Sequence, residues 1–225
     1  MKIIDFHTHI LPNADHGSDS LETSLKQLEL SEKVPIDTFI ATSHFYPHRH
    51  RVNDFLKRRD ESYSLLSSHT DKEIILGAEV LLCEGLNKLP GIENLTIGNS
   101  KIILLELPFN QFKSEYETAI EAFIDEGYTV VLAHADRYPK ENIERLLPLG
   151  AKIQLNASSL SGFFPKKHLF EWIERGVVVA LGSDIHMADK NAYPSFVKMR
   201  KKLGTSFDEI MIKCNELLFT QTNDI

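Results

Sequence analysis

The sequence has few cysteines, no long hydrophobic run and neither of the common nucleotide-binding motifs. Its two cysteines, Cys83 and Cys214, form no CxxC pair, which argues against a disulfide framework and fits a reducing compartment. No stretch approaches the roughly eighteen apolar residues of a membrane-spanning helix. GxGxxG and GxxxxGK[ST] are both missing, so a nucleotide-binding doubly wound sheet is not indicated.

Positive charge is also in short supply. The chain has 25 Lys and Arg against 32 Asp and Glu, a formal net charge of −7. This balance argues against a general nucleic-acid binder and against a protein that binds anionic membranes, because both usually carry a basic surplus. Any recognition of phosphate would have to be local. The first His-x-His element begins at His7 and leaves no room for a cleavable signal peptide, so we expect a cytoplasmic protein.

What the chain does contain is seven short runs rich in β-branched and aliphatic residues, which predict strands. Several are apolar almost throughout, as in strands that are covered on both faces. The runs are Lys2–His7, Thr38–Ser43, Glu73–Val80, Lys101–Leu107, Tyr128–Ala133, Ala151–Asn156 and Val177–Gly182. Segments with helical periodicity separate them, so the order predicts parallel β/α units.

Helical periodicity is clearest over Lys113–Glu126, where Gly127 supplies a stop. Nearer the N-terminus, Asp19 and Glu22 have the spacing of a capping box. There is no internal repeat, low-complexity tract or linker, so we expect residues 1–225 to form a single α/β domain. A seven-stranded (β/α)7 barrel is the favoured architecture, and an open doubly wound sheet is the alternative.

Ten histidines in 225 residues are the one compositional oddity, and polar residues end nearly every predicted strand. In β/α barrels, chemistry gathers at the carboxyl ends of the strands. A histidine at one strand end is more often a hydrogen-bonded structural residue than a ligand. Six of the seven runs nevertheless end in His, Asp or Glu, and the residues are His7 and His9, His44, Glu79, Glu106, His134, and Asp184 with His186. This repetition favours a metal centre.

The strongest local signals are two pairs spaced i, i+2. Strand alternation places His7 and His9 on one face about 7 Å apart, so both imidazoles can converge on one ion. Asp184 and His186 repeat the spacing near the other end of the chain.

Two glutamates also favour a metal. Glu79 and Glu106 are each the only acidic residue in the apolar core of their strands, and an unpaired buried carboxylate is unfavourable. A metal would stabilise them there, and a salt bridge to a barrel lysine or arginine is the alternative. The donors are nitrogen and oxygen with no thiolate, which suits Zn²⁺, Mn²⁺, Fe²⁺ or Co²⁺. They are too many for one ion, and three divalent ions would make a cationic pocket that attracts phosphate.

Two basic features lie close to these strand ends. Arg137 follows His134 by three residues and could direct its guanidinium at a phosphate, or pair at the surface with Asp136 or Glu141. The loop PHRHR at 47–51 is consistent equally with substrate contact and with a solvated loop.

The motifs DFHTH, ATSH, GAEV, LLEL, AHADRY and GSDIH, in this order, resemble the PHP (polymerase and histidinol phosphatase) superfamily. Longer stretches, including LTIGNSKIILLELPF and NASSLSGFFPKKHLFEWIERG, are similar to the CpsB-type bacterial protein-tyrosine phosphatases of capsule and exopolysaccharide systems. The resemblance covers nearly the whole chain. It implies a distorted, seven-stranded TIM-like barrel (the PHP fold) with two or three divalent ions, of which Mn²⁺ is favoured.

The resemblance also implies which residues hold each metal. The first position takes His7, His9, Glu79 and Asp184, the second takes the bridging Glu79 with Glu106 and His134, and the third takes His44, His186 and residue 16. The family usually has aspartate where this chain has His16, so either His16 or Asp15 is the expected third-position ligand. Arg137 is the implied phosphate-binding residue. His16, Asp184 or His186 would protonate the leaving phenolate.

The expected activity is therefore a metal-dependent phosphomonoesterase that removes phosphate from phosphotyrosine in protein, with a metal-bound hydroxide attacking phosphorus. A bacterial tyrosine kinase is the expected substrate protein. A cysteine-based mechanism is excluded because neither cysteine is followed by an arginine six positions later.

Three other functions remain in competition. A PHP phosphatase acting on histidinol phosphate or another small ester would share the metal chemistry. A TatD-like nuclease also opens with His-x-His, but it lacks the Asp-x-His found at Asp184, and the net charge of −7 gives polynucleotide little attraction. A non-catalytic regulator would have lost ligands, whereas every position here keeps a competent one. We expect no nucleic-acid partner and no direct membrane insertion, and the sequence leaves the oligomeric state open.

Overall fold

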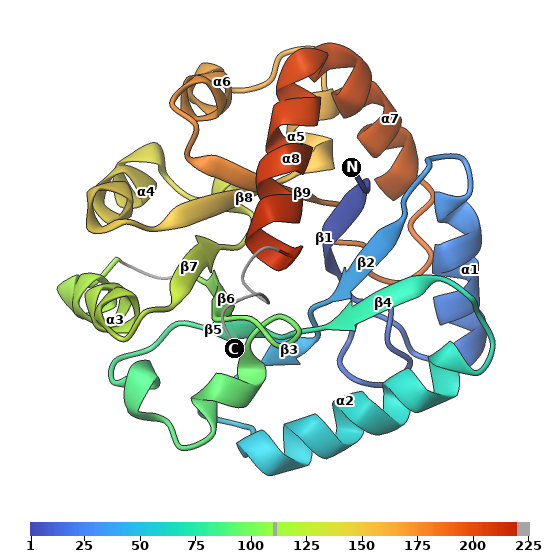
Figure 1. Ribbon diagram of the computed structural model, residues 1–225, viewed down its shortest axis with the longest axis horizontal. Helices are drawn as coiled ribbons and strands as arrows, with labels where there is room; N and C mark the ends of the chain where they lie inside the picture. The colour runs from blue at the N-terminus through green and yellow to red at the C-terminus, as the bar shows by residue number, and fades with distance from the viewer. Residues whose placement is uncertain (110–111, 220–225) are drawn as a thin grey trace.

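The computed structural model describes residues 1–109 and 112–219, and it places two parallel β-sheets inside a surround of helices (Figure 1). The first sheet has the order β1 (Ile4–Thr8), β2 (Thr38–Ala41) and β4 (Glu73–Leu76). The second has the order β3 (His44–Phe45), β5 (Glu79–Leu81), β6 (Ile102–Glu106), β7 (Thr129–Leu132), β8 (Lys152–Asn156) and β9 (Val178–Gly182). Every pairing is parallel, so the carboxyl ends of the strands lie on one side.

The helices follow the strands in the alternating order that the sequence predicts. They are α1 (Leu21–Ser31), α2 (Val52–Ser67), α3 (Ser114–Asp125), α4 (Lys140–Leu146), α5 (Ala157–Ser161), α6 (Lys167–Glu174), α7 (Ala192–Leu203) and α8 (Thr205–Phe219). Short 3₁₀ turns are η1 (Leu86–Lys88), η2 (Ile92–Leu95), η3 (Ala135–Arg137) and η4 (Leu147–Leu149). None of the described helices combines the length and apolar character that a membrane span requires.

The predicted count of seven strands is wrong, because the third predicted run is divided into two strands and a short additional strand, β3, follows the second run. After Ala41 the chain leaves the first sheet and resumes pairing at His44, and the third run breaks at Gly77 in the same way. There the backbone N–H of Gly77 donates to Ala41 O at 2.9 Å, and that of Glu79 donates to Ser43 O at 3.1 Å. The breaks fall at Thr42 and Ser43 and at Gly77 and Ala78, and such short interruptions do not by themselves indicate a change of sheet.

A single closed barrel is not confirmed, since the strands belong to two sheets rather than one continuous ladder. The segment that follows β9 does return to the first strand. The N–H of Asp184 donates to His7 O at 2.8 Å, and an isolated bridge joins Thr8 to Ile185. The ends of β1 and β9, which carry two predicted ligand pairs, therefore lie side by side.

Two helix predictions have different outcomes. The helix expected over Lys113–Glu126 is confirmed as α3. The proposed cap at Asp19 is wrong, because α1 begins at Leu21 and its N-cap is Ser20, whose hydroxyl accepts from Thr23 N at 3.1 Å. Asp19 instead accepts a hydrogen bond from the Thr23 hydroxyl at 2.6 Å. Ser20 has the extended backbone that an N-cap needs.

The hydrophobic core fills the space between the sheets and the helices. Strands β1, β6 and β9 are buried along their whole length, and Trp172, Phe123 and Phe196 from the helices are fully covered. Burial on both faces explains why these strands read as nearly continuous apolar runs. Polar residues interrupt the strands at a few positions, and those nearest the carboxyl ends contribute to the candidate site.

Candidate metal centre

The structure brings all nine predicted metal-binding residues together. His44 and Glu79 begin the short strands β3 and β5, and the other seven lie at or after the carboxyl ends of β1, β6, β7 and β9. Parallel pairing places these ends together, and the turns that follow them carry the remaining side chains. Seven of the nine are buried, namely His7, His9, His44, Glu79, Glu106, His134 and Asp184. His16 is exposed and His186 is partly exposed, so these two imidazoles form the outer edge of the cluster.

Four donor atoms lie close together, and three of them, from His7, His9 and Glu79, form a group that could hold a metal ion. They are the Nε2 atoms of His7 and His9, Glu79 Oε2 and Asp184 Oδ1. The separations that involve a histidine nitrogen lie between 3.1 and 3.6 Å. A tetrahedral ion with ligand bonds of about 2.1 Å holds its ligands about 3.4 Å apart. The five separations that involve a histidine therefore have the spacing that a divalent ion requires.

The orientation of the two imidazoles supports the same interpretation. His7 Nδ1 lies 3.1 Å from Gln154 Oε1, and His9 Nδ1 lies 2.7 Å from Asp15 Oδ2. These acceptors fix a proton on each Nδ1, which leaves the two Nε2 lone pairs facing each other at 3.1 Å. Two facing lone pairs repel unless a cation or a proton lies between them.

A second group of donors shares Glu79 with the first. Glu79 Oε1 lies 2.7 Å from His134 Nε2, while its other oxygen faces His7 and His9. Glu106 completes this group, with Oε1 3.8 Å from His134 Nε2 and Oε2 3.9 Å from His44 Nδ1. Glu79 can therefore offer one oxygen to each of two ions.

Imidazoles dominate the third group. The ring centroid of His44 lies 4.5 Å from that of His16 and 4.4 Å from that of His9, and the ring of His186 lies 4.0 Å from His9. His44 Nδ1 is buried and has no hydrogen-bond partner among the described residues, although Glu79 Oε2 is 3.0 Å away. A buried nitrogen without a partner is unfavourable, and a metal ion would satisfy it.

Asp15 and His16, the two alternatives for the third position, have different surroundings. Asp15 Oδ2 accepts from His9 Nδ1 and from the backbone N–H of His44 at 2.8 Å, while Oδ1 accepts from Gly17 N at 2.8 Å. Both carboxylate oxygens of Asp15 therefore already accept hydrogen bonds, and the residue lies behind His9 rather than among the donors. His16 stacks on His44 and faces the pocket.

Two carboxylates of the cluster have pKa values shifted in opposite directions in the metal-free chain, because their neighbours differ. Burial by itself would raise the pKa of Glu79, but His7, His134 and His44 hold that pKa well below its usual value. Burial and the charge of Glu79 raise the pKa of Glu106 to about 7. One carboxyl group of the cluster thus retains a proton near neutral pH, and a bound divalent cation would favour its release.

Arg137 enters the site from η3, the turn that follows β7. His134 at the start of this turn has a φ of +31° and Asp184 has a φ of +53°, which is a conformation that side-chain-bearing residues seldom adopt. The Arg137 guanidinium pairs with Asp184 Oδ2. Its predicted alternative partner Asp136 is instead bonded through Oδ1 to Asn156 N at 2.8 Å. The Arg137 side chain is 42% exposed, so it can also reach a ligand.

A hollow of about 450 Å³ opens above the cluster. It is lined by His16, His44, Tyr46, His48, Arg49, Leu81, Glu106, Phe109, Arg137 and His186. The loop at 47–51 thus contributes two of its basic residues to the wall. Tyr46 and Phe109 add aromatic surface beside the donors.

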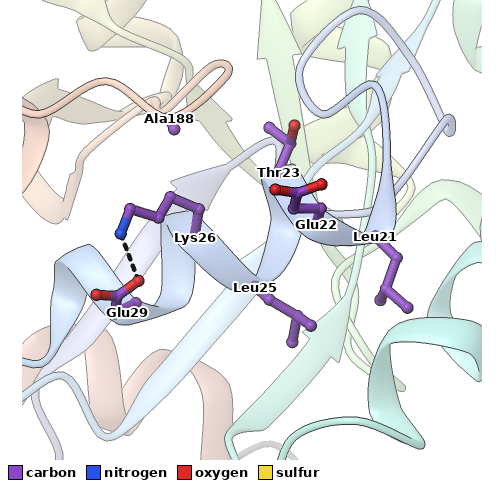
Figure 2. A pocket seen from close by; sticks show the side chains of 7 residues that line it. All are labelled: Leu21, Glu22, Thr23, Leu25, Lys26, Glu29 and Ala188. Carbon is purple, nitrogen blue, oxygen red and sulfur yellow. Dashed lines mark hydrogen bonds and ion pairs between the residues drawn. The ribbon is translucent and has the colours of Figure 1, made fainter.

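Another hollow, of about 800 Å³, lies along α1 (Figure 2). Figure 2 shows Leu21 and Leu25 with the ion pair between Lys26 and Glu29, and Ala188 faces the helix from across the hollow. None of its lining residues belongs to the metal cluster. Its size alone therefore does not make it the functional site.

Sequence reasoning missed Gln154 and passed over Asn156. Gln154 Oε1 accepts from the N–H of His134 at 2.6 Å as well as facing His7, and its Nε2 donates to Asn156 Oδ1 at 2.9 Å. Asn156 Nδ2 donates to Asp184 Oδ2 at 3.0 Å. Both lie on β8 with i, i+2 spacing, the same signal that identifies His7 and His9.

Comparison with known proteins decides the family. Residues 3–224 match the family model described as capsular polysaccharide synthesis, CpsB/CapC. The chain belongs to the CpsB/CapC family. Among its members, the tyrosine-protein phosphatase CpsB of Streptococcus pneumoniae is 28% identical, over 83% of this chain and 84% of that protein. The tyrosine-protein phosphatase YwqE of Bacillus subtilis is 25% identical, over 96% and 91%.

Solved structures of the CpsB/CapC family share the fold. A crystal structure from a study of YwqE and CpsB, described as unique metal-dependent tyrosine phosphatases, aligns with a TM-score of 0.78. The alignment covers 98% of this chain and 96% of the other at 22% identity. A β-aspartyl dipeptidase from Fervidobacterium islandicum aligns more loosely, with a TM-score of 0.53 and 13% identity. At these identities the likeness concerns the fold alone.

Proposed function

We propose that this chain is a metal-dependent protein-tyrosine phosphatase. One observation carries the proposal: the donors of His7, His9, Glu79 and Asp184 converge with the spacing of a metal site beneath a pocket that contains an arginine. The names of the relatives supply the substrate class, since CpsB and YwqE are tyrosine-protein phosphatases. The −7 net charge is compatible with a phosphate substrate because bound cations would make the pocket locally positive.

We assign the donors to three metal positions. The first uses His7, His9, Glu79 and Asp184, and the second uses Glu79, Glu106 and His134. For the third we propose His44 and His186 together with His16 rather than Asp15, because both oxygens of Asp15 already accept hydrogen bonds. Divalent ions bound there would polarise phosphoryl oxygens and make water a stronger nucleophile at neutral pH.

The protein's own groups would position the substrate. We propose that Arg137 binds two phosphoryl oxygens through its planar guanidinium, with Asp184 holding it in place. Asp184 has a pKa held far below its usual value by His7, His9 and Arg137 despite burial, so it acts as an acceptor rather than as a proton donor. His186 also lines the pocket, but we assign it to the third metal position, and burial and His9 lower its pKa to about 4, so it does not serve as the proton donor to the leaving oxygen.

Four further properties remain predictions. They are a distorted barrel enclosed jointly by the two sheets, a single domain over residues 1–225, a cytoplasmic location and a bacterial tyrosine kinase as the substrate protein. Residues 110–111 and 220–225 of that domain lie outside the described part of the chain.

One panel of assays tests the proposed function. Purified protein with Mn²⁺, Zn²⁺ or chelator is offered a phosphotyrosine peptide, a phosphoserine peptide, histidinol phosphate and single-stranded DNA. We expect metal-dependent turnover of the phosphotyrosine peptide above all others, since a phenolate with a pKa of about 10 leaves more readily than an alkoxide. Turnover that survives chelation, or none on any phosphomonoester, would contradict the proposal. Faster turnover of histidinol phosphate would instead favour the small-molecule phosphatase.

Arg137→Ala tests the phosphate-binding role that we assign to Arg137. We expect kcat/KM to fall about 100-fold or more, because a charged hydrogen-bond donor to the transferred group is lost. Arg145→Ala, which removes an arginine paired with Glu117 at the surface, is the control and should retain activity. Full activity of Arg137→Ala would remove the phosphate-binding assignment.

A further inference from the structure

The connection between α5 and α6 carries two aromatic side chains that are almost fully exposed. Phe163 and Phe164 each keep 97% of their surface in water, whereas the next most exposed phenylalanine, Phe109, is 68% exposed and stacks on Tyr138. We call these two residues the aromatic tip. Large apolar side chains that are adjacent and unpacked usually mark an interaction site.

Lysines surround the aromatic tip. The ammonium group of Lys202, in the last turn of α7, donates to Gly162 O directly before the tip. Lys198 lies one turn earlier on the same side of α7, and Lys166 and Lys167 follow the tip in sequence. Arg200 differs from these lysines, because its guanidinium carbon lies over the ring of Phe207, 5.4 Å from the ring centroid.

Neighbouring carboxylates offset only part of the charge of this patch. The Lys167 side chain is 93% exposed, and its ammonium lies 3.9 Å from Glu171, which already forms a 2.8 Å ion pair with Lys140. Among the described residues, Lys198 and Lys202 form no ion pair with an acidic side chain. A local positive patch therefore stands on a protein whose net charge is −7.

The aromatic tip stands near the mouth of the phosphatase pocket. The Lys166 ammonium donates to Asp136 O at 2.9 Å, and Asp136 directly precedes the pocket residue Arg137. The α5–α6 connection follows the carboxyl end of β8, the side of the sheet on which the metal cluster lies. In Figure 1 this connection runs along the outer edge of the molecule.

We propose that the aromatic tip and its lysines form a peripheral contact with an anionic lipid surface. Phenylalanines with flanking lysines suit the membrane interface, where rings enter the acyl boundary and ammonium groups meet lipid phosphates. A projecting tip offers no groove for a peptide. A symmetric contact with a second copy would bring lysines against lysines. The rest of the protein is acidic, so the same anionic lipid surface would repel it. This repulsion would leave the side with the aromatic tip and the pocket mouth facing the lipid.

The proposal is tested by vesicle flotation of the full chain. Vesicles are made of phosphatidylcholine alone or mixed with phosphatidylglycerol, at low and high salt. We expect binding to the mixed vesicles only, weakened by salt. The double substitution Phe163→Ser and Phe164→Ser should bind about tenfold more weakly, because two apolar contacts are lost. Lys167→Gln with Lys198→Gln should reduce binding to anionic vesicles as well.

Matched controls use α2, on another part of the surface. Leu65→Ser removes a side chain that is 44% exposed, and Lys57→Gln removes one whose side chain is 77% exposed. Neither should alter vesicle binding, and thermal melts verify that all variants are folded. In Phe164→Trp, the emission should shift to shorter wavelength on mixed vesicles.

Three outcomes would overturn the proposal. One is absence of binding to mixed vesicles, and another is equal binding by the double serine variant. The third is sedimentation showing a dimer in the parent chain that the double serine variant loses, which would assign the aromatic tip to a second copy. Because flotation does not depend on catalysis, its result is separate from that of the phosphatase assays.

Discussion

At the scale of single residues, the metal cluster depends on side chains that hold the histidines in one orientation. Asp15 and Gln154 accept from the Nδ1 atoms of His9 and His7, and both leave the Nε2 atoms free for a metal. Such partners set the tautomer of a ligand histidine and increase its basicity. Metal affinity should therefore be sensitive to residues that never touch the ion.

Gln154→Leu tests this dependence. The substitution removes the acceptor for His7 and for the backbone N–H of His134, so metal affinity should fall by roughly 10- to 100-fold. Competition with a coloured chelator measures the affinity. Lys152→Ala, on the same strand but off the cluster, is the control. Unchanged affinity in Gln154→Leu would show that the glutamine does not position His7.

Glu106 gives a pH-dependent prediction for the chelated protein. Its pKa is about 7 in the folded chain, above the ordinary value of 4.5, because of burial and the nearby Glu79. Between these two values the folded state keeps a proton that the unfolded state has released. Glu106 therefore makes the free energy of unfolding decrease as pH rises through this window.

In Glu106→Gln this contribution disappears, so the chelated variant should lose less stability than the parent between these two pH values. Urea unfolding across the window provides the measurement. Glu174→Gln, which changes an exposed glutamate on α6, is the control and should follow the parent. Parallel pH profiles for Glu106→Gln and the parent would contradict the assigned shift.

At the scale of elements, close backbone approach brings β1 and β9 together. Gly182 ends β9, and a Cβ atom there would lie 2.6 Å from His7 Cβ and 2.8 Å from Gln154 Nε2. Gly17 is similar, since a Cβ atom there would lie 2.1 Å from His9 Cβ. His7 in β1 and His9 just after it, two of the candidate ligands, are therefore packed against backbone positions with no room for a side chain.

Gly182→Ala should displace His7 and destabilise the fold by about 1–3 kcal/mol, the usual range for overpacking. Metal content after dialysis and urea unfolding measure the two effects. The matched control is Gly162→Ala, where an added Cβ meets no atom within 4 Å and the φ of −65° suits alanine. Equal behaviour of the two variants would contradict the packing argument.

At the scale of the whole molecule, metal binding should couple to folding. The donors come from both sheets, so they converge only in the folded chain. A ligand that binds only the folded state at 100 times its Kd stabilises that state by about 2.7 kcal/mol. For a chain of this size, this corresponds to a rise in Tm of roughly 5–10 °C.

Chelation should therefore lower the Tm of the metal-loaded protein by about that amount, as measured by calorimetry. His7→Ala removes a central donor, so chelator should change its Tm much less. If chelator leaves the Tm of the parent unchanged, the metal does not bind the folded state in preference to the unfolded one.

Much of this organisation could be predicted from the sequence, because it is local. Apolar runs located every strand except β3, and the residues at their ends supplied eight of the nine candidate ligands. The ninth, His16, came from the family resemblance. The breaks after Ala41 and before Ala78 could not be predicted, since they depend on hydrogen bonds between segments distant in sequence. Gln154 was missed for a related reason, because an amide gains its role only when His7 lies opposite it.

The sequence by itself determined the identity and order of the donors, since side-chain chemistry and alternation along a strand are properties of adjacent residues. Only the tertiary structure decided how those donors are distributed. Asp15 and His16 are neighbours in the chain, yet one lies behind His9 and the other faces the pocket. Their placement depends on close contacts between β1, β3 and the segment after β9. These contacts exist only when the sheets have packed together.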